Sequence, residues 1–327
     1  MAGTGDARPE HMDHTGRRRV EVVVPGVMSR FVIPRFLRVT RRNRNYVDAA
    51  RATAHVRERA LRPLAYGPPR TLRGVEVSVE HDRGWPIYTL TPSDGISRGS
   101  LVYAHGGGWV GEIASQHWQL AARIAAQTHL VVTVPIYPLI PFGTAAEVIP
   151  RFAELVRAAG ERYGPTFLAG DSAGGQIALS TALHLRDAGH IVARTMLISP
   201  ALDLTLENPE IDAVLLRDPW LGRDGGLVFG RMWSGELSMK DPLVSPLFGD
   251  FGGLGPLTVF TGTDDILNPD ARLLAAKARA AGVDLDYHEE PGLVHVYPLT
   301  PSPEGAAARR RIITTLRAEL DAAHSIS

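Results

Sequence analysis

A serine with a glycine two residues away on each side places the strongest constraint on the fold of this chain. Residues 170–175 read GDSAGG, after a short, mostly apolar run at 166–169 and before a helix-like segment that begins at residue 173. Only small neighbours let a strand turn this sharply into a helix, and the turn exposes the serine oxygen above the sheet. The order of strand, turn and helix therefore predicts that Ser172 is a nucleophile on an elbow of a parallel sheet.

A second glycine-rich segment precedes this elbow. Residues 105–109 read HGGGW and directly follow the apolar run 101–104. Three successive glycines cost conformational entropy when the chain folds. They are best explained by backbone N–H groups that must approach a ligand closely. An oxyanion formed in acyl transfer fits this need, with the N–H of Ala173 beside it. A phosphate loop is the alternative, but the GxGxxG and Gly-Lys-Ser/Thr patterns are absent, so we expect no nucleotide site and no cofactor.

HGGGW followed by GDSAGG resembles the hormone-sensitive-lipase-like branch of the α/β-hydrolases, the group of many bacterial carboxylesterases. Residues 137–141, 199–203 and 241–247 resemble further segments of that family, in the same order along the chain. The resemblance implies an α/β-hydrolase fold, with a mostly parallel central sheet flanked by helices and a helical cap. Pro138 stands where the family usually has arginine, so we expect the polar network around that segment to be rearranged.

A serine nucleophile needs a base and an orienting carboxylate, which in this fold follow it in the order acid, then histidine. Two adjacent acids, Asp264 and Asp265, follow the apolar run 256–260. The family pattern Gly-x-x-Asp-x-Leu selects Asp265 and leaves Asp264 as a turn residue. His288 lies in an alternating run typical of a half-buried strand. His295 lies in the loop beyond that strand and matches the family's histidine loop, so we expect it to be the base.

The mechanism that the resemblance implies is a two-step acyl transfer. His295 takes the proton of Ser172 as the serine attacks a carbonyl carbon, and Asp265 orients the imidazole. Water then hydrolyses the covalent acyl-enzyme. The resemblance assigns the oxyanion to three backbone N–H groups, those of Gly107, Gly108 and Ala173.

Two polar residues beside the motifs are expected to support them. His105 should shape the oxyanion loop through a backbone hydrogen bond rather than transfer protons. Asp171 should bond nearby backbone at the elbow, although tuning of substrate polarity is an alternative for this carboxylate.

The segments outside the core pattern are expected to form the cap, at 20–71 and 205–245. Residues 17–73 carry 15 arginines against three acidic residues, with apolar residues such as Phe31 and Phe36 between the arginines. A membrane-surface helix is one interpretation. We favour cap helices whose basic residues face solvent, as the family's N-terminal helices imply.

Aromatic residues near the expected site are candidates for substrate contact. An aromatic cluster beside a hydrolase site suits an apolar acyl or alcohol group, although aromatics at helical spacing are as often the core of a cap. The candidates are Trp109, next to the oxyanion loop, and Trp220 and Trp233 in the second cap segment.

The remaining sequence divides into a polar tail, expected to be disordered, and a catalytic core. The tail is 1–19, and the core comprises 72–204 and 246–327. We expect an opening pair of strands at 75–81 and 85–91, and helices near 115–128, 145–163, 173–188, 268–281 and 303–324.

Composition excludes several classes of function. The formal net charge of zero gives no general attraction to nucleic acid. The absence of cysteine excludes a disulfide framework, a thiol nucleophile and a cysteine-ligated metal, and we expect no metal site. No apolar run approaches membrane-spanning length, so we expect a cytoplasmic protein. Because we favour cap helices over a membrane-surface helix, we also expect no membrane contact. A homodimer is compatible with the sequence.

These observations predict a serine carboxylic-ester hydrolase whose partners are a small-molecule ester and water. A lidded pocket limits chain length, so the family resemblance implies short- to medium-chain acyl groups. A deacetylase or lactone hydrolase of a specialised metabolite would need the same three side chains. A non-catalytic ligand-binding module on the same scaffold belongs to a different class, because a fold does not fix a function.

Overall fold

Eight strands form one sheet in the order β1-β2-β4-β3-β5-β6-β7-β8 in the computed structural model, which describes residues 26–324. The pairs β1–β2 and β2–β4 are antiparallel and all the others are parallel. This mostly parallel sheet confirms the predicted fold class. The strands span Val75–Asp82 (β1), Trp85–Pro92 (β2), Ser100–Ala104 (β3), Val131–Pro135 (β4), Thr166–Asp171 (β5), Thr195–Ile198 (β6), Leu257–Asp264 (β7) and Leu285–Val294 (β8).

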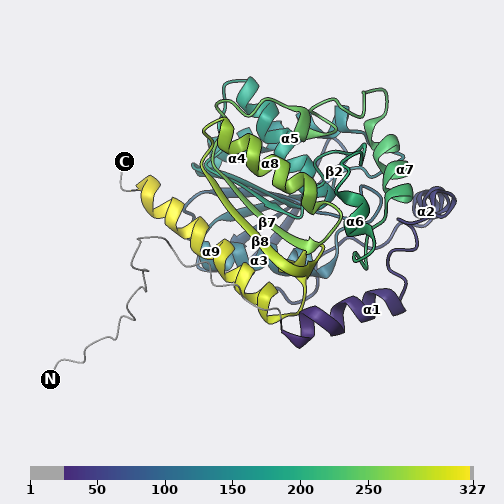
Figure 1. The fold of residues 1–327 in the computed structure, drawn as a ribbon. Coiled ribbons are helices and arrows are strands. Elements are labelled where there is room, and N and C mark those ends of the chain that lie inside the picture. The colour runs from purple at the N-terminus through teal and green to yellow at the C-terminus, as the bar shows by residue number, and fades with distance from the viewer. Residues whose placement is uncertain (1–25, 325–327) are drawn as a thin grey trace, which may run out of the picture.

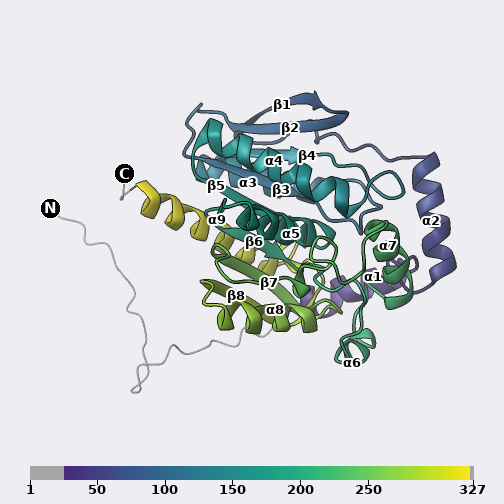
Figure 2. The same cartoon turned by 90° about the horizontal axis from the view of Figure 1, so that it is seen from above.

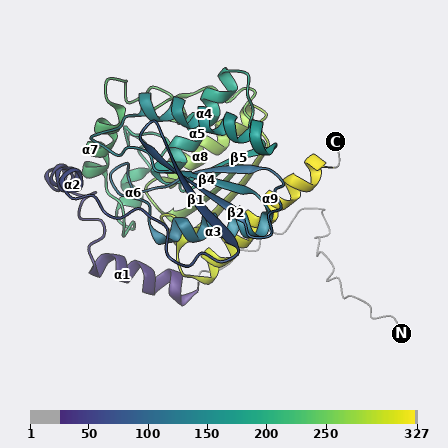
Figure 3. The ribbon, with the colours of Figure 1, turned by 180° about the vertical axis from the view of Figure 1, so that it is seen from behind.

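Helices cover both faces of the sheet, which explains why the central strands β3 to β6 are buried along their whole length. One face carries α4, α5 and α8, and the opposite face carries α3 and α9 (Figure 1, Figure 3). Each layer packs its own hydrophobic core against the sheet. The five helices span Ser115–Thr128 (α3), Ala145–Tyr163 (α4), Ala173–Asp187 (α5), Asn268–Ala280 (α8) and Pro303–His324 (α9).

A separate group of helices lies together at one end of the sheet (Figure 2). These helices come from the two segments predicted for the cap, and α2 packs against α7. They span Met28–Val32 (a π-helical turn, η1), Ile33–Val39 (α1), Ala49–Leu61 (α2), Ile211–Leu215 (α6) and Arg223–Ser234 (α7). The predicted tail 1–19 and the first residues of the predicted N-terminal cap lie outside the described residues.

The last strand is longer than the alternation of its sequence predicts. The pattern ends at His288, whereas β8 continues to Val294. The reason is pairing with β7, which persists past an irregularity at Gly262 and Asp264 and joins Asp264 to Val294. His295 therefore directly follows the last residue of the strand.

None of the helices within residues 26–324 combines the length and the apolar character needed to cross a membrane.

Candidate active site

Ser172 occupies a strained turn between β5 and α5. Its φ of 54° and ψ of −119° lie in a region that side-chain-bearing residues rarely adopt. The neighbouring glycines permit the turn, because a Cβ on Gly170 would lie 2.1 Å from the carbonyl oxygen of Gly174. A Cβ on Gly174 would lie 2.0 Å from the carbonyl oxygen of Ala104 on β3. The elbow motif is thus required by close backbone contacts on both sides of the serine.

His295 and Asp265 lie in line with the serine. The His295 Nε2 atom is 2.9 Å from Ser172 Oγ, and the Nδ1 atom is 2.8 Å from Asp265 Oδ2. Asp265 is fully buried, and its other oxygen accepts a hydrogen bond from Leu267 N. Asp264 points elsewhere and pairs with Arg217 at 3.1 Å. The structure therefore brings Asp265, and not its neighbour, to the imidazole.

The electrostatic surroundings of His295 favour its protonated form. Burial lowers the pKa of His295, but the carboxylate of Asp265 raises it, with smaller contributions from Asp218 and Asp171. The net effect is a pKa above the ordinary value. A histidine in this setting is stabilised as an imidazolium, which is the form a general base takes after it has accepted a proton.

The glycine-rich segment after β3 forms a loop beside the serine. Gly107 has a φ of 129° and Gly108 a φ of 62°. A Cβ on Gly108 would lie 2.7 Å from the hydroxyl of Tyr46. Among the described residues, the N–H groups of these two glycines have no protein hydrogen-bond partner. The N–H of Ala173 opens helix α5, where the first amides lack intrahelical partners. All three amides are thus available to a ligand.

Asp171 joins the serine elbow to this loop. Its Oδ1 atom accepts hydrogen bonds from Tyr103 Oη at 2.6 Å and from Gly106 N at 3.0 Å, and its Oδ2 lies 3.2 Å from His117 Nε2. Burial raises the pKa of Asp171, but His117 and these hydrogen bonds outweigh it and lower the pKa below the usual value. The backbone amide that Asp171 binds thus belongs to the glycine loop. His105 Nδ1 lies 2.8 Å from Gly106 O, within the loop.

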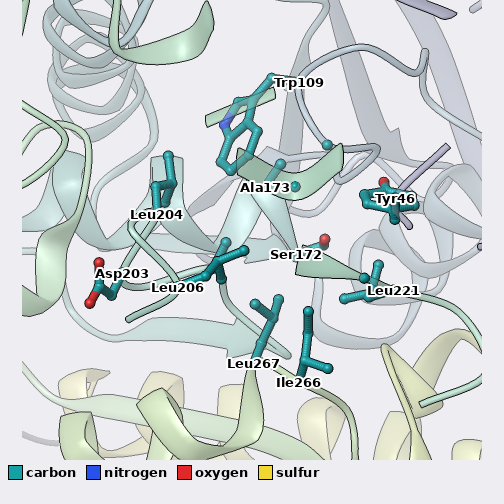
Figure 4. Close-up of a pocket in the computed structure, with 14 residues that line it drawn as sticks. Tyr46, Trp109, Ser172, Ala173, Asp203, Leu204, Leu206, Leu221, Ile266 and Leu267 are labelled. Atoms are coloured by element: carbon teal, nitrogen blue, oxygen red, sulfur yellow. The ribbon is translucent and has the colours of Figure 1, made fainter. Parts of the chain in front are cut away.

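A small cavity of about 50 Å³ opens beside Ser172 (Figure 4). Its wall is mostly apolar and combines the core with both cap segments. Tyr46 comes from the N-terminal cap segment, and Leu204, Leu206 and Leu221 come from the region around the second one. The lining residues are Tyr46, Gly108, Trp109, Ser172, Ala173, Ala201, Asp203, Leu204, Leu206, Leu221, Gly222, Gly226, Ile266 and Leu267.

The three candidate tryptophans have different environments. Trp109 lines the cavity. Trp233 does not line it, because it is fully buried and stacks on Trp109 with ring centroids 5.7 Å apart. The two indole N–H groups donate to the same buried oxygen, Gln176 Oε1, at 3.2 and 2.9 Å. Trp220 also lies outside the cavity wall and packs edge-on against His295, with ring centroids 5.8 Å apart.

The loop at residues 217–221 contacts both His295 and the residue after Asp265, and sequence reasoning missed its key residue. Asp218 is buried, and its Oδ1 atom accepts hydrogen bonds from Trp220 N and Leu221 N. Its Oδ2 atom accepts one from Ile266 N at 2.9 Å, next to Asp265. Burial and the nearby Asp265 raise the pKa of Asp218 to about 6. An Asp-Pro pair in a cap loop carried no signal of this contact, because the partner amide lies far away in the sequence.

Nothing in the described part of the chain gathers three or more His, Asp or Glu side chains in an arrangement that could hold a metal ion.

The sequence of this chain is similar to those of known α/β hydrolases. A family model described as the α/β hydrolase fold matches residues 101–299. A putative acetyl-hydrolase of Mycobacterium tuberculosis, LipR, is 30% identical over 258 residues, which cover 77% of this chain and 82% of LipR. A triacylglycerol lipase of the same organism is 32% identical over 71% of this chain, but the chain spans only 50% of that protein.

Solved structures show the same fold at lower sequence identity. EstE7, a hormone-sensitive-lipase homologue from a metagenome library, superposes with a TM-score of 0.75 at 23% identity. The match covers 88% of this chain and 98% of EstE7. A putative esterase from Staphylococcus aureus superposes with a TM-score of 0.78 at 24% identity, over 84% of this chain and 95% of that one.

Proposed function

Because this chain belongs to the α/β-hydrolase family, we propose that it hydrolyses carboxylic esters through Ser172, His295 and Asp265, as a carboxylesterase like those of the hormone-sensitive-lipase group that its motifs resemble. The observation that carries this proposal is the pair of contacts made by His295, 2.9 Å to the serine oxygen and 2.8 Å to the buried carboxylate. This geometry lets one imidazole nitrogen accept the serine proton while the other donates to Asp265.

In the first step, the Oγ atom of Ser172 bonds to the ester carbonyl carbon and its proton passes to His295 Nε2. The carbonyl π electrons move to oxygen, and the amides of Gly107, Gly108 and Ala173 stabilise the oxyanion. Collapse of this intermediate breaks the bond to the alcohol, which leaves with the proton from His295. In the second step, water repeats the sequence on the acyl-enzyme and releases the carboxylic acid.

The acyl group is proposed to be short. The cavity beside Ser172 is about 50 Å³, and leucine and isoleucine side chains from the cap and from the two residues after Asp265 line it. Pockets for drug-sized ligands are several times larger, at about 300 Å³ or more. An acyl chain beyond a few carbons would require these side chains to move.

Acetyl esters are the specific candidate within this class. Two relatives at 30% identity carry the name acetyl-hydrolase, LipR of Mycobacterium tuberculosis and a protein of Streptomyces hygroscopicus. A deacetylase acting on an acetylated metabolite would use the same serine chemistry, with the cavity holding the acetyl group and the alcohol lying outside the cavity.

A graded series of p-nitrophenyl esters, from acetate to laurate, tests both proposals. The wild-type chain should hydrolyse the shortest esters with the highest kcat/KM, and Ser172→Ala should lower kcat by a factor of about 10⁴ to 10⁶. Activity that survives in Ser172→Ala would refute the assignment of the nucleophile. A maximum at long chains would refute the short acyl group, and inactivity of the folded wild-type chain towards all esters would support the binding-module alternative.

A further inference from the structure

The first helical segment of the described chain turns its apolar side chains outward. The helix from Met28 to Val39 combines η1 and α1 and exposes a stripe of five large apolar residues along one side. Phe31 is 59% exposed, Phe36 is 55% exposed and Val39 is 72% exposed. We name this set the α1 stripe, and its members are Met28, Phe31, Val32, Phe36 and Val39.

The neighbouring basic helix, α2, has the opposite arrangement, with apolar side chains buried and arginines exposed. Helix α2 buries Ala52 and Val56 in the cap core and turns Arg51 and Arg57 to the surface. This is the expected behaviour of a basic cap helix. The α1 segment buries Ser29, Pro34 and Leu37 instead, so the larger apolar residues are left outside. Its apolar surface has no partner within the described part of the chain.

The segment is held in place by contacts from its buried side and its ends. The Ser29 hydroxyl donates to Glu304 Oε2 at 2.5 Å, and Gly26 N donates to Glu304 Oε1 at 2.6 Å. At the other end, Arg38 donates to the carbonyl oxygen of Arg217 in the loop at residues 217–221. The α1 stripe therefore sits on a fixed support at the cap end of the molecule, on the same side as α2, α6 and α7 (Figure 2).

The charge around the stripe has one sign. Residues 26–47 contain six arginines and no acidic residue, although the whole chain has a net charge of zero. All six arginines are exposed, and within residues 26–324 none of them forms an ion pair. They are Arg30, Arg35, Arg38, Arg41, Arg42 and Arg44.

We propose that the α1 stripe and its arginines form a docking surface for an anionic lipid surface. A helix with exposed aromatic and aliphatic residues flanked by arginines lies in the interface plane of a membrane, with apolar side chains among the acyl chains and guanidinium groups at the phosphates. A second copy of the chain fits this surface poorly, because it would bring two sets of six unpaired arginines together. The proposal is independent of the ester chemistry at Ser172.

Vesicle sedimentation with the full chain tests the proposal. The probes are phosphatidylcholine vesicles with and without phosphatidylglycerol, at low and high salt. The wild-type chain should sediment with the anionic vesicles only, and high salt should release part of it. Arg30→Gln combined with Arg35→Gln should lower the partition coefficient by about 30-fold, from about fivefold for each arginine near the surface. Phe31→Ser combined with Phe36→Ser should lower it by roughly tenfold per residue.

Matched controls separate this surface from general stickiness. Phe142→Ser removes a phenylalanine that is 70% exposed elsewhere, and Arg123→Gln combined with Arg162→Gln removes two exposed arginines outside the cap. Both controls should bind as the wild-type chain does. All variants should keep their far-UV circular dichroism and their hydrolysis of soluble p-nitrophenyl acetate, since none touches the cavity.

Two results would overturn the proposal. The first is equal binding of the Phe31/Phe36 variant and the wild-type chain to anionic vesicles. The second is an absence of vesicle binding by the wild-type chain. This result would overturn the proposal whether or not light scattering shows a wild-type dimer that the Phe31/Phe36 variant does not form. Such a dimer would identify a second copy as the occupant of the stripe.

Discussion

Replacement of Asp218 by asparagine should impair the active site through the loop that carries Asp265. The substitution keeps one oxygen to accept from Trp220 N and Leu221 N. It replaces the oxygen that accepts from Ile266 N with an NH₂ group, which leaves a buried amide without an acceptor. An unsatisfied buried amide costs about 1 to 3 kcal/mol. If this free energy destabilises the arrangement of the loop that carries Asp265, kcat/KM falls by about 5- to 150-fold.

Asp218→Asn should change kcat more than KM. Leu221 lines the cavity, and its backbone keeps its hydrogen bond in Asp218→Asn, so kcat should fall with little change in KM. Asp218→Ala releases Leu221 as well, so KM should rise too. The pH profile gives a second readout, because the Asp218 carboxylate raises the pKa of His295. Removing that negative charge should shift the acid limb of kcat/KM to lower pH.

The assay is p-nitrophenyl acetate hydrolysis between pH 5 and pH 9, about the range in which a histidine base titrates. Asp224→Asn is the matched control, since Asp224 is an exposed aspartate in the same cap segment. It should leave both kcat and the acid limb unchanged. Equal kinetics for Asp218→Asn and the wild-type chain, with the acid limb unmoved, would refute the bracing role.

Three further predictions concern buried polar groups and the glycine loop. Gln176→Leu leaves two indole N–H groups without their acceptor and should lower the free energy of unfolding in urea by about 2 to 6 kcal/mol; a loss below 1 kcal/mol would contradict this. Burial raises the pKa of Asp270 to about 7 from 3.8, so the folded state binds the extra proton and stability should fall as pH rises from about 4 to 7. Asp270→Asn should remove that part of the pH dependence of Tm, and an unchanged slope would contradict the assignment. Gly108→Ala should lower kcat/KM by about 100-fold or more, because its Cβ would meet Tyr46, whereas Gly189→Ala, also at positive φ but in open space, should keep full activity.

The sequence predicts the elements of the core well because their signals are local. The elbow at Ser172 needs glycine on both sides, because a Cβ there would clash with nearby backbone atoms. This requirement appears in the sequence as glycines two residues before and after the serine. The helices α3 and α4 begin and end where the pattern places them. The end of β8 cannot be read from the alternating run around His288, because that boundary depends on pairing with β7 and not on the alternation of its own residues.

The contacts that support the site are not local and leave no such pattern. Asp218 reads as a turn residue before a proline, and only the folded chain brings it to Ile266 N. Gln176 sits inside a helix that the sequence predicts, but its two tryptophan partners come from the glycine loop and from the cap. In the N-terminal segment the arginines face solvent, as expected, but a basic helix with interspersed phenylalanines gives no sign that Phe31 and Phe36 are exposed as well.

Covalent labelling tests the central claim most directly. A fluorophosphonate probe reacts with a serine only when a base removes its proton and amides stabilise the resulting charge. We predict one adduct per chain, located on Ser172 by peptide mass mapping, with esterase activity lost in proportion to labelling and with little labelling in His295→Ala. An adduct on another residue, or full labelling of Ser172 with the activity intact, would contradict the account.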